Sequence, residues 1–162
     1  MTGEPGAVTV TALTGDSSGP ESGLDQRSAA NGVIATMQAR LFPCPLSELI
    51  AVLEEDPRLE RAWRVIELNY QEAGLRLDRA AKLAGISKTR LNVLLQRAIG
   101  MTFHQLLTRY RLFQAVNGIA LDDSGLLDLA LKVGFGSVRT LERNFLKAFG
   151  AAPRTLKIFR AC

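Results

Sequence analysis

The sequence contains few of the side chains on which most enzymes and metal sites depend. Its 162 residues include two cysteines, Cys44 and Cys162, and one histidine, His104. Neither cysteine has a CxxC partner or other metal-type spacing, so we interpret both as free thiols in a reducing compartment. The sequence also has no phosphate-binding glycine loop and no acid–histidine–nucleophile set. These absences argue against an enzyme and against a bound metal or cofactor.

Long apolar runs and a secretory leader are missing as well. No stretch reaches the roughly 18 apolar residues that a membrane helix requires. The first residues, Met-Thr-Gly-Glu-Pro, do not provide a basic region followed by an apolar core, so they do not form a secretory signal. We therefore expect a cytoplasmic protein that does not contact a membrane.

Charge is distributed unevenly along the chain. Residues 1–59 carry three basic and eight acidic side chains, whereas residues 60–162 carry seventeen basic and eight acidic ones. The net charge is therefore −5 in the first part and +9 in the second. Such a basic region favours a polyanionic partner, although an ordinary solvated surface produces a similar excess.

Composition divides the chain into three parts. Residues 1–32 contain six of the fourteen glycines, together with proline, serine and threonine, which predicts a disordered leader. Residues 33–58 are predicted to form a short helical extension, with one helix starting near Pro45 and a second after Asp56. Residues 59–162 are predicted to be all-α, because helical periodicity continues and no core strand is evident.

An internal repeat in the basic region carries the functional argument. Its copies lie about 50 residues apart and share an alanine, a glycine four positions later and then an apolar residue: Ala81, Gly85 and Ile86, then Ala130, Gly134 and Phe135. The alanine lets two helices cross closely, and the glycine adopts a left-handed backbone at low cost. The apolar residue fills the angle between the helices, and Ser87 is placed to cap the next helix. This pattern is typical of a helix-turn-helix. Two αα-hairpins in an ordinary core are the alternative, and two basic copies in register argue against it.

The second copy resembles the AraC/XylS family of transcription regulators. The residues similar to that family's second helix-turn-helix are the run Leu129-Ala130-Leu131-Lys132-Val133-Gly134-Phe135, then Leu141, Arg143, Phe145, Lys147, Phe149-Gly150 and Pro153. The joining helix matches at Arg111, Leu112 and Ala115. The resemblance extends over about residues 60–160.

The resemblance implies seven helices forming two helix-turn-helix subdomains joined by a long connector helix. The expected bounds are about 77–99 for the first subdomain, 102–117 for the connector and 125–149 for the second. Such a domain binds double-stranded DNA with its two recognition helices in successive major grooves, a helical turn or roughly 34 Å apart.

The resemblance and the helical spacing together predict the residues that contact DNA. In the first recognition helix these are Ser87, Lys88, Thr89, Arg90, Asn92, Val93 and Gln96. In the second they are Ser137, Arg139, Thr140, Arg143 and Lys147. Asparagine and glutamine pair with adenine, whereas lysine and arginine favour guanine or phosphate. The two helix-turn-helix subdomains, about residues 77–99 and 125–149, are called the first and second heads. The family commonly has arginine at Val93, so this position either packs on a thymine methyl or leaves the first head binding DNA weakly. The alternative is that these cations only keep the surface soluble.

The sequence thus predicts a sequence-specific, nucleoid-associated transcription regulator. Residues 1–58 are too short for the sensor domain of effector-gated family members, so no small-molecule effector domain is expected. A protein partner such as RNA polymerase or another regulator is the candidate for the N-terminal extension. The rival hypothesis is an adaptor that does not bind DNA and holds RNA polymerase or another regulator with the same helices. Val93, Leu146 and the acidic leader favour the rival slightly.

Overall fold

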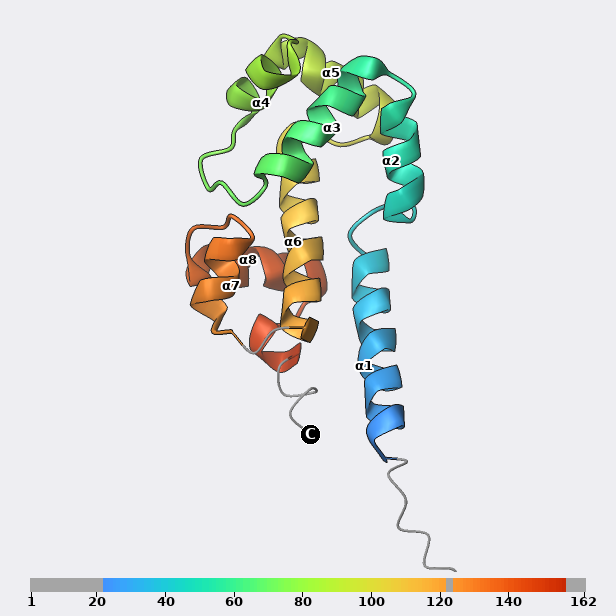
Figure 1. Ribbon diagram of the computed structural model, residues 1–162, viewed down its shortest axis with the longest axis vertical. Helices are drawn as coiled ribbons and strands as arrows, with labels where there is room; N and C mark the ends of the chain where they lie inside the picture. The colour runs from blue at the N-terminus through green and yellow to red at the C-terminus, as the bar shows by residue number, and fades with distance from the viewer. Residues whose placement is uncertain (1–21, 122–123, 157–162) are drawn as a thin grey trace, which may run out of the picture.

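A long central helix, α6 (Phe103–Leu121), organises the fold and runs vertically through the middle of Figure 1. The computed structural model describes residues 22–121 and 124–156, and side chains within residues 28–120 and 124–156. This described part is helical throughout and contains no strand, which confirms the predicted all-α class. Helix α6 contacts α1, α5, α7 and α8, so it joins the two halves of the molecule.

Two short helices precede the repeat region and begin where local sequence signals place them. Helix α2 (Leu46–Glu54) starts after Pro45, and α3 (Pro57–Asn69) starts after Asp56. The Asp56 carboxylate accepts a hydrogen bond from the Arg58 backbone N–H at 2.9 Å and pairs with the Arg58 guanidinium at 2.7 Å. These interactions lower the pKa of Asp56 from 3.8 to about 2. Both predicted helix starts are confirmed.

The first helix, α1 (Ser22–Ala39), corrects the predicted leader. Residues 22–32 were assigned to disorder from their composition, but they are helical; residues 1–21 lie outside the described residues. Helix α1 runs antiparallel beside α6 (Figure 1), where Met37 is buried and Gln38 Nε2 donates to Asn117 Oδ1 at 2.6 Å. Tertiary packing of this kind outweighs the poor helix propensity of Gly32.

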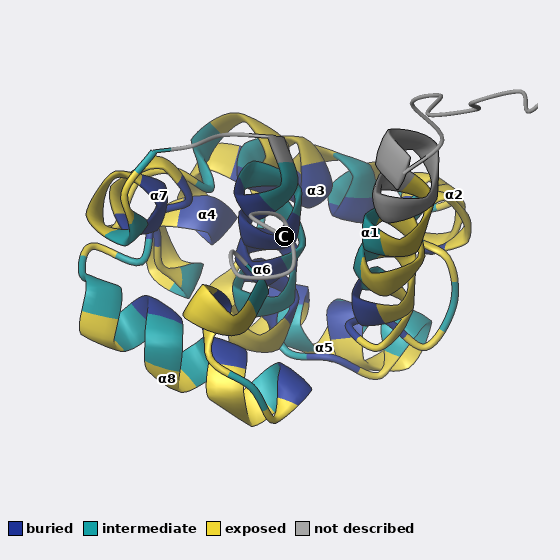
Figure 2. Ribbon diagram, turned by 90° about the horizontal axis from the view of Figure 1, so that it is seen from below, coloured by how far each residue is buried: buried dark blue, intermediate teal, exposed yellow. Residues whose placement is uncertain are grey.

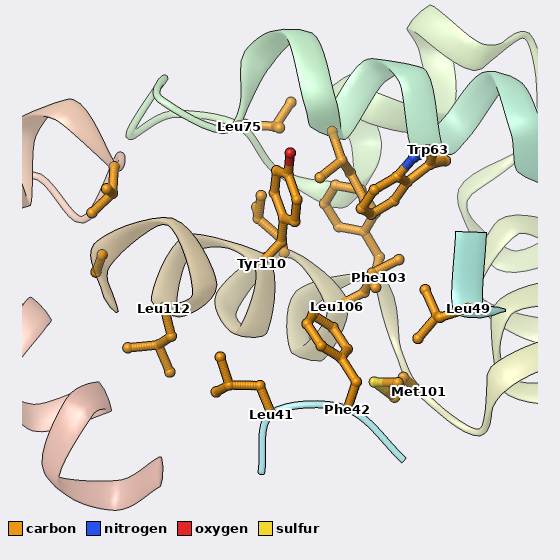
Figure 3. Close-up of a cluster of buried hydrophobic side chains, with 14 of the residues drawn as sticks. Leu41, Phe42, Leu49, Trp63, Leu75, Met101, Phe103, Leu106, Tyr110 and Leu112 are labelled. Carbon is orange, nitrogen blue, oxygen red and sulfur yellow. The ribbon is translucent and has the colours of Figure 1, made fainter. Parts of the chain in front are cut away.

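The first half of the core forms where α3 and the segment before α2 meet α6. Figure 3 shows Tyr110 of α6 beside Trp63, with Phe42 on the opposite side of the helix and Phe103 and Leu106 between Trp63 and Phe42. Trp63 is 2% exposed, and its ring meets the edge of Tyr110 with centroids 5.0 Å apart. These side chains fix α3 against the upper half of α6.

Residues 77–99 form the first helix pair, as predicted. Helix α4 (Leu77–Ala84) and helix α5 (Lys88–Ile99) end at Gly85 and Gly100, both with a left-handed backbone. Because these glycines adopt φ values near +68° at no steric cost, they end the helices at the positions that the sequence indicates.

The second helix pair, α7 (Leu126–Lys132) and α8 (Val138–Phe149), packs on the lower half of α6. Residues 153–156 are also helical, so the region from α3 onward contains seven helical segments in the described part, as the resemblance implies. Figure 2, which looks along α6 from below, shows buried residues concentrated on α6 and on the faces turned toward it.

Helix α6 is longer than predicted, because Gly118 does not end it. The sequence placed the end of the connector at about residue 117, but the helix continues to Leu121. A Cβ at Gly118 would lie 2.5 Å from Leu129 Cδ1. This glycine therefore serves the close approach of α7 rather than a helix end.

Candidate nucleic-acid interface

The two predicted helix-turn-helix turns have equivalent backbones. Gly85 has φ +68° and Gly134 has φ +82°. In each copy the amide after the glycine donates to the carbonyl of the shared alanine: Ile86 N to Ala81 O at 3.0 Å, and Phe135 N to Ala130 O at 2.9 Å. The extra residue of the second turn is accommodated by a second left-handed glycine, Gly136, with φ +73°. The repeat in the sequence is therefore a repeat in structure.

Each of the two helices that follow begins with a serine cap. Ser87 Oγ accepts from Arg90 N at 3.3 Å, and Ser137 Oγ accepts from Thr140 N at 3.2 Å. A helix N-terminus has other backbone N–H groups without intrahelical partners, and it carries a partial positive charge. Both α5 and α8 therefore start with geometry that favours a phosphate oxygen.

Both helices have one buried face and one open face. Leu91 and Leu95 of α5, and Leu141 and Phe145 of α8, are at most 1% exposed. The exposed members of the predicted contact set are Ser87, Lys88, Thr89, Arg90, Val93, Gln96, Arg139, Arg143 and Lys147. The structure thus brings these predicted residues to the open faces of α5 and α8.

Three predicted contact residues are half-buried, and each makes an internal hydrogen bond. Asn92 Oδ1 accepts from Phe103 N at 3.0 Å, so this side chain supports the start of α6. Ser137 Oγ and Thr140 Oγ1 lie 2.9 Å apart and share a hydrogen bond. Sequence reasoning missed the role of Asn92, because its partner lies eleven residues later, beyond the turn at Gly100, and no local pattern links them.

The two open faces differ in their chemistry. Helix α8 presents Arg139, Arg143 and Lys147, and its single acid, Glu142, lies 3.6 Å from Arg154. Helix α5 contains no acid, but the centre of its open face is Val93, which is 43% exposed. The faces are both cationic, and that of α5 has an apolar centre.

Known proteins share this arrangement. A family described as a helix-turn-helix domain matches residues 80–157. The probable transcription factor PqrA of Proteus vulgaris is 32% identical over 91 residues, which are 56% of this chain and 74% of PqrA. The chain belongs to the AraC/XylS family. It is therefore a DNA-binding transcription regulator of the helix-turn-helix class.

Other similar proteins differ in how much of their length this chain matches. The transcriptional activator RhaS of Yersinia pestis is 31% identical over 104 residues, so the chain matches 38% of its length. An AraC-type transcriptional regulator from Chromobacterium violaceum is 25% identical with a TM-score of 0.59, over 65% of this chain and 93% of that one. The C-terminal domain of AraT from Geobacillus stearothermophilus has the same fold, with a TM-score of 0.61 at 23% identity over 64% of this chain and 85% of that domain.

Among the described residues, none of the helices combines the length and the apolar character of a membrane span. No group of three or more histidine, cysteine or acidic side chains there is placed to hold a metal ion.

Proposed function

We propose that this AraC/XylS regulator binds double-stranded DNA sequence-specifically, with α5 and α8 in successive major grooves on one face of the duplex. The observation that carries the proposal is that two helices with a similar preceding turn, a serine cap and a buried stripe both present open cationic faces. A recognition helix needs this combination, because its buried stripe fixes it to the domain while its open face meets base edges.

Helix α8 is proposed to be the stronger head. Arg139 lies in its first turn, where it reaches either a base edge or a phosphate. Arg143 lies one turn later on the same open face, and Lys147 one turn beyond that. Ser137 and the N-terminal backbone N–H groups of α8 are proposed to bind a phosphate.

Helix α5 is proposed to be the weaker head. Thr89 and Gln96 are its exposed polar residues for reading bases, and Lys88 and Arg90 are placed for phosphate contacts. Asn92 Oδ1 already accepts a hydrogen bond from Phe103, so only the Asn92 amide N–H groups remain for DNA. Val93 offers an apolar contact, such as one with a thymine methyl.

The remaining features of the proposal concern the setting of the protein. We propose that it acts at the nucleoid in the cytoplasm, without catalysis and without a cofactor. We propose that a protein partner such as RNA polymerase would meet the exposed part of α1, where Val33 is 40% exposed.

A salt series is the direct test of this proposal. Fluorescence anisotropy with a 24-base-pair random duplex should give a slope of log affinity against log salt concentration of about −0.9 per phosphate neutralised. A flat salt dependence would contradict DNA binding and support an adaptor that contacts protein.

Single substitutions then test the two heads on a duplex selected by the wild-type chain. Arg143→Ala should weaken binding by about 1–3 kcal/mol if Arg143 reads a base, or reduce the salt slope by about one unit if it contacts phosphate. Val93→Arg should tighten binding, because it adds a cation at a groove-facing position. Arg64→Ala is the matched control, since it removes one exposed cation from α3, outside both recognition helices. If Arg143→Ala and Arg64→Ala weaken binding equally, and Val93→Arg tightens it by the same amount, only the net charge matters.

A further inference from the structure

One arginine is buried at the point where the two heads meet. Arg111 of α6 is 8% exposed, and it is the one charged residue that is buried in the described part of the chain. Its Nε donates to Tyr70 O at 2.8 Å and its second terminal nitrogen donates to Glu72 O at 2.7 Å. Tyr70 is the C-cap residue that follows α3, and Glu72 lies in the connection to α4. Arg111 therefore holds the entry to the first head against the connector helix.

The turn of the second head closes on the same point. A Cβ added at Gly134 would overlap Tyr70 O and would lie 2.9 Å from Arg111 Nε. A Cβ added at Gly136 would lie 3.4 Å from Ala73 Cβ. The second turn therefore rests directly on the connection between α3 and α4, and Arg111 bonds the same backbone segment.

The corresponding glycine of the first head has no such neighbour. A Cβ added at Gly85 would meet no atom within 4 Å. Because Gly85 and Gly134 occupy equivalent positions with similar backbone angles, the turn itself does not require the close approach at Gly134. The tight contact belongs to the interface between the heads.

We propose that Arg111, the carbonyl groups of Tyr70 and Glu72, and the bare Cα of Gly134 form a junction that fixes the orientation of α5 relative to α8. Arg111 and Gly134 are thus positioning residues for two-groove binding. This inference deepens the proposed function and rests on it for its effect on DNA.

The chemistry of the arginine suits this task. A guanidinium donates in two fixed directions, whereas the point charge of lysine does not hold two carbonyl groups in one geometry. Burying a charge costs free energy, and the two hydrogen bonds to the Tyr70 and Glu72 carbonyl groups offset that cost. Losing either hydrogen bond would leave the buried guanidinium partly unsatisfied. A movement of one head relative to the other that stretches these hydrogen bonds therefore costs free energy.

Rigidity of this kind raises affinity on a site with two grooves. Once one head is bound, the second binds at an effective concentration set by the geometry, and a gain of about 10²–10⁴-fold is available when that geometry matches the site. A loose junction spreads the second head over many orientations and loses part of this gain. The heads themselves can keep their contacts with a single groove.

A distance measurement tests the junction without DNA. Spin labels are attached at Arg97→Cys on α5 and Leu146→Cys on α8, both exposed positions outside the predicted contact set, in a chain with Cys44→Ala and Cys162→Ala. The parent chain should give one narrow distance distribution, and Arg111→Gln should broaden it. An unchanged distribution would overturn the inference.

Matched variants separate the junction from general damage. Arg109→Gln removes a hydrogen bond from the next arginine of α6, which donates to Leu41 O at 3.0 Å, and it should leave the distribution narrow. Gly85→Ala adds the same left-handed strain as Gly134→Ala, but only Gly134→Ala should shift or broaden the distance. If Arg111→Gln loses its helical circular dichroism, the distance is measured in Arg111→Lys instead. Equal broadening by the junction variants and by both controls would also refute the proposal.

The DNA arm uses the duplex selected by the wild-type chain and the same duplex with five base pairs inserted between the footprints of the two heads. The insertion rotates one half-site by about half a turn, so the wild-type chain should lose roughly 100-fold in affinity. Arg111→Gln should bind the original duplex about tenfold more weakly and should lose much less on insertion. If the wild-type chain binds no duplex, the proposed function fails while the distance result still decides the junction. If Arg111→Gln responds to the insertion as the wild-type chain does, the junction does not position the heads.

Discussion

Replacing Trp63 with alanine tests whether the core beneath the first head depends on this ring. Trp63 is 2% exposed and meets Tyr110 edge-on with centroids 5.0 Å apart. A buried tryptophan removes roughly 150–250 Å² from water. At about 25 cal/mol per Å² this corresponds to about 4–6 kcal/mol, of which the alanine side chain retains a small part. We therefore expect Trp63→Ala to lower the free energy of unfolding by about 3–5 kcal/mol.

The indole N–H makes the comparison with phenylalanine informative. Trp63 Nε1 is buried and has no hydrogen-bond partner within the described part of the chain. A buried donor without a partner costs about 1–3 kcal/mol, and Trp63→Phe removes that cost while it keeps one aromatic ring against Tyr110. The gain offsets most of the lost volume, so Trp63→Phe should cost less than about 2 kcal/mol.

Urea unfolding followed by far-ultraviolet circular dichroism measures both variants, with the slope of the transition compared against the wild-type slope. Equal costs for the alanine and phenylalanine variants would refute the reasoning, because they would show that the N–H is satisfied and contributes to stability. A cost below about 1 kcal/mol for Trp63→Ala would show that the ring is not part of the core.

Three further predictions address other parts of the fold. Met37→Ala should cost about 2–3 kcal/mol in urea unfolding because it leaves a cavity between α1 and α6, and no loss would mean that α1 does not pack there. Asp56 has a folded pKa of about 2, below its ordinary 3.8, so its contribution is present above pH 4 and is lost as the pH falls through 2. The thermal midpoint of Asp56→Asn should lie below the wild-type value at pH 7 and meet it near pH 2; a constant difference contradicts this origin. Gly118→Ala should stabilise the fold by less than the roughly 1 kcal/mol that alanine gains over glycine in an open helix interior, because the new Cβ displaces a terminal methyl group of Leu129, and a gain of the full size would contradict that contact.

The helix bounds that the sequence predicted well are those set by local chemistry. Asp56 and Ser87 cap helices with their own side chains, and Gly85 and Gly100 end helices with a left-handed backbone. Each of these signals operates within four residues of the helix end, so it is visible without knowledge of the fold. The internal repeat added the pairing of helices, because two copies of one pattern imply two copies of one structure.

The features that the sequence did not predict depend on partners far along the chain. Helix α1 is held by α6, about eighty residues away, through contacts such as that of Gln38 with Asn117. The helical spacing predicts that Asn92 faces outward as a recognition residue, yet its Oδ1 accepts a hydrogen bond from Phe103 N. Arg111 matched the family pattern, but its two carbonyl partners lie 41 and 39 residues earlier. No local periodicity encodes such contacts.

The junction between the heads compensates for the weaker DNA contacts proposed for the first head. Helix α8 presents three cations on its open face, whereas the open face of α5 has Val93 at its centre and uses the Asn92 oxygen internally. A head that binds weakly on its own gains little affinity unless the entropy of positioning it has been removed beforehand. Arg111 supplies that restriction in the folded protein before any DNA is present, by bonding the segment that leads into the first head at 2.8 and 2.7 Å. On our proposal, α8 binds DNA first, and the junction holds α5 in the orientation that the next major groove requires. The weak head thereby tests the spacing of the site as well as its sequence.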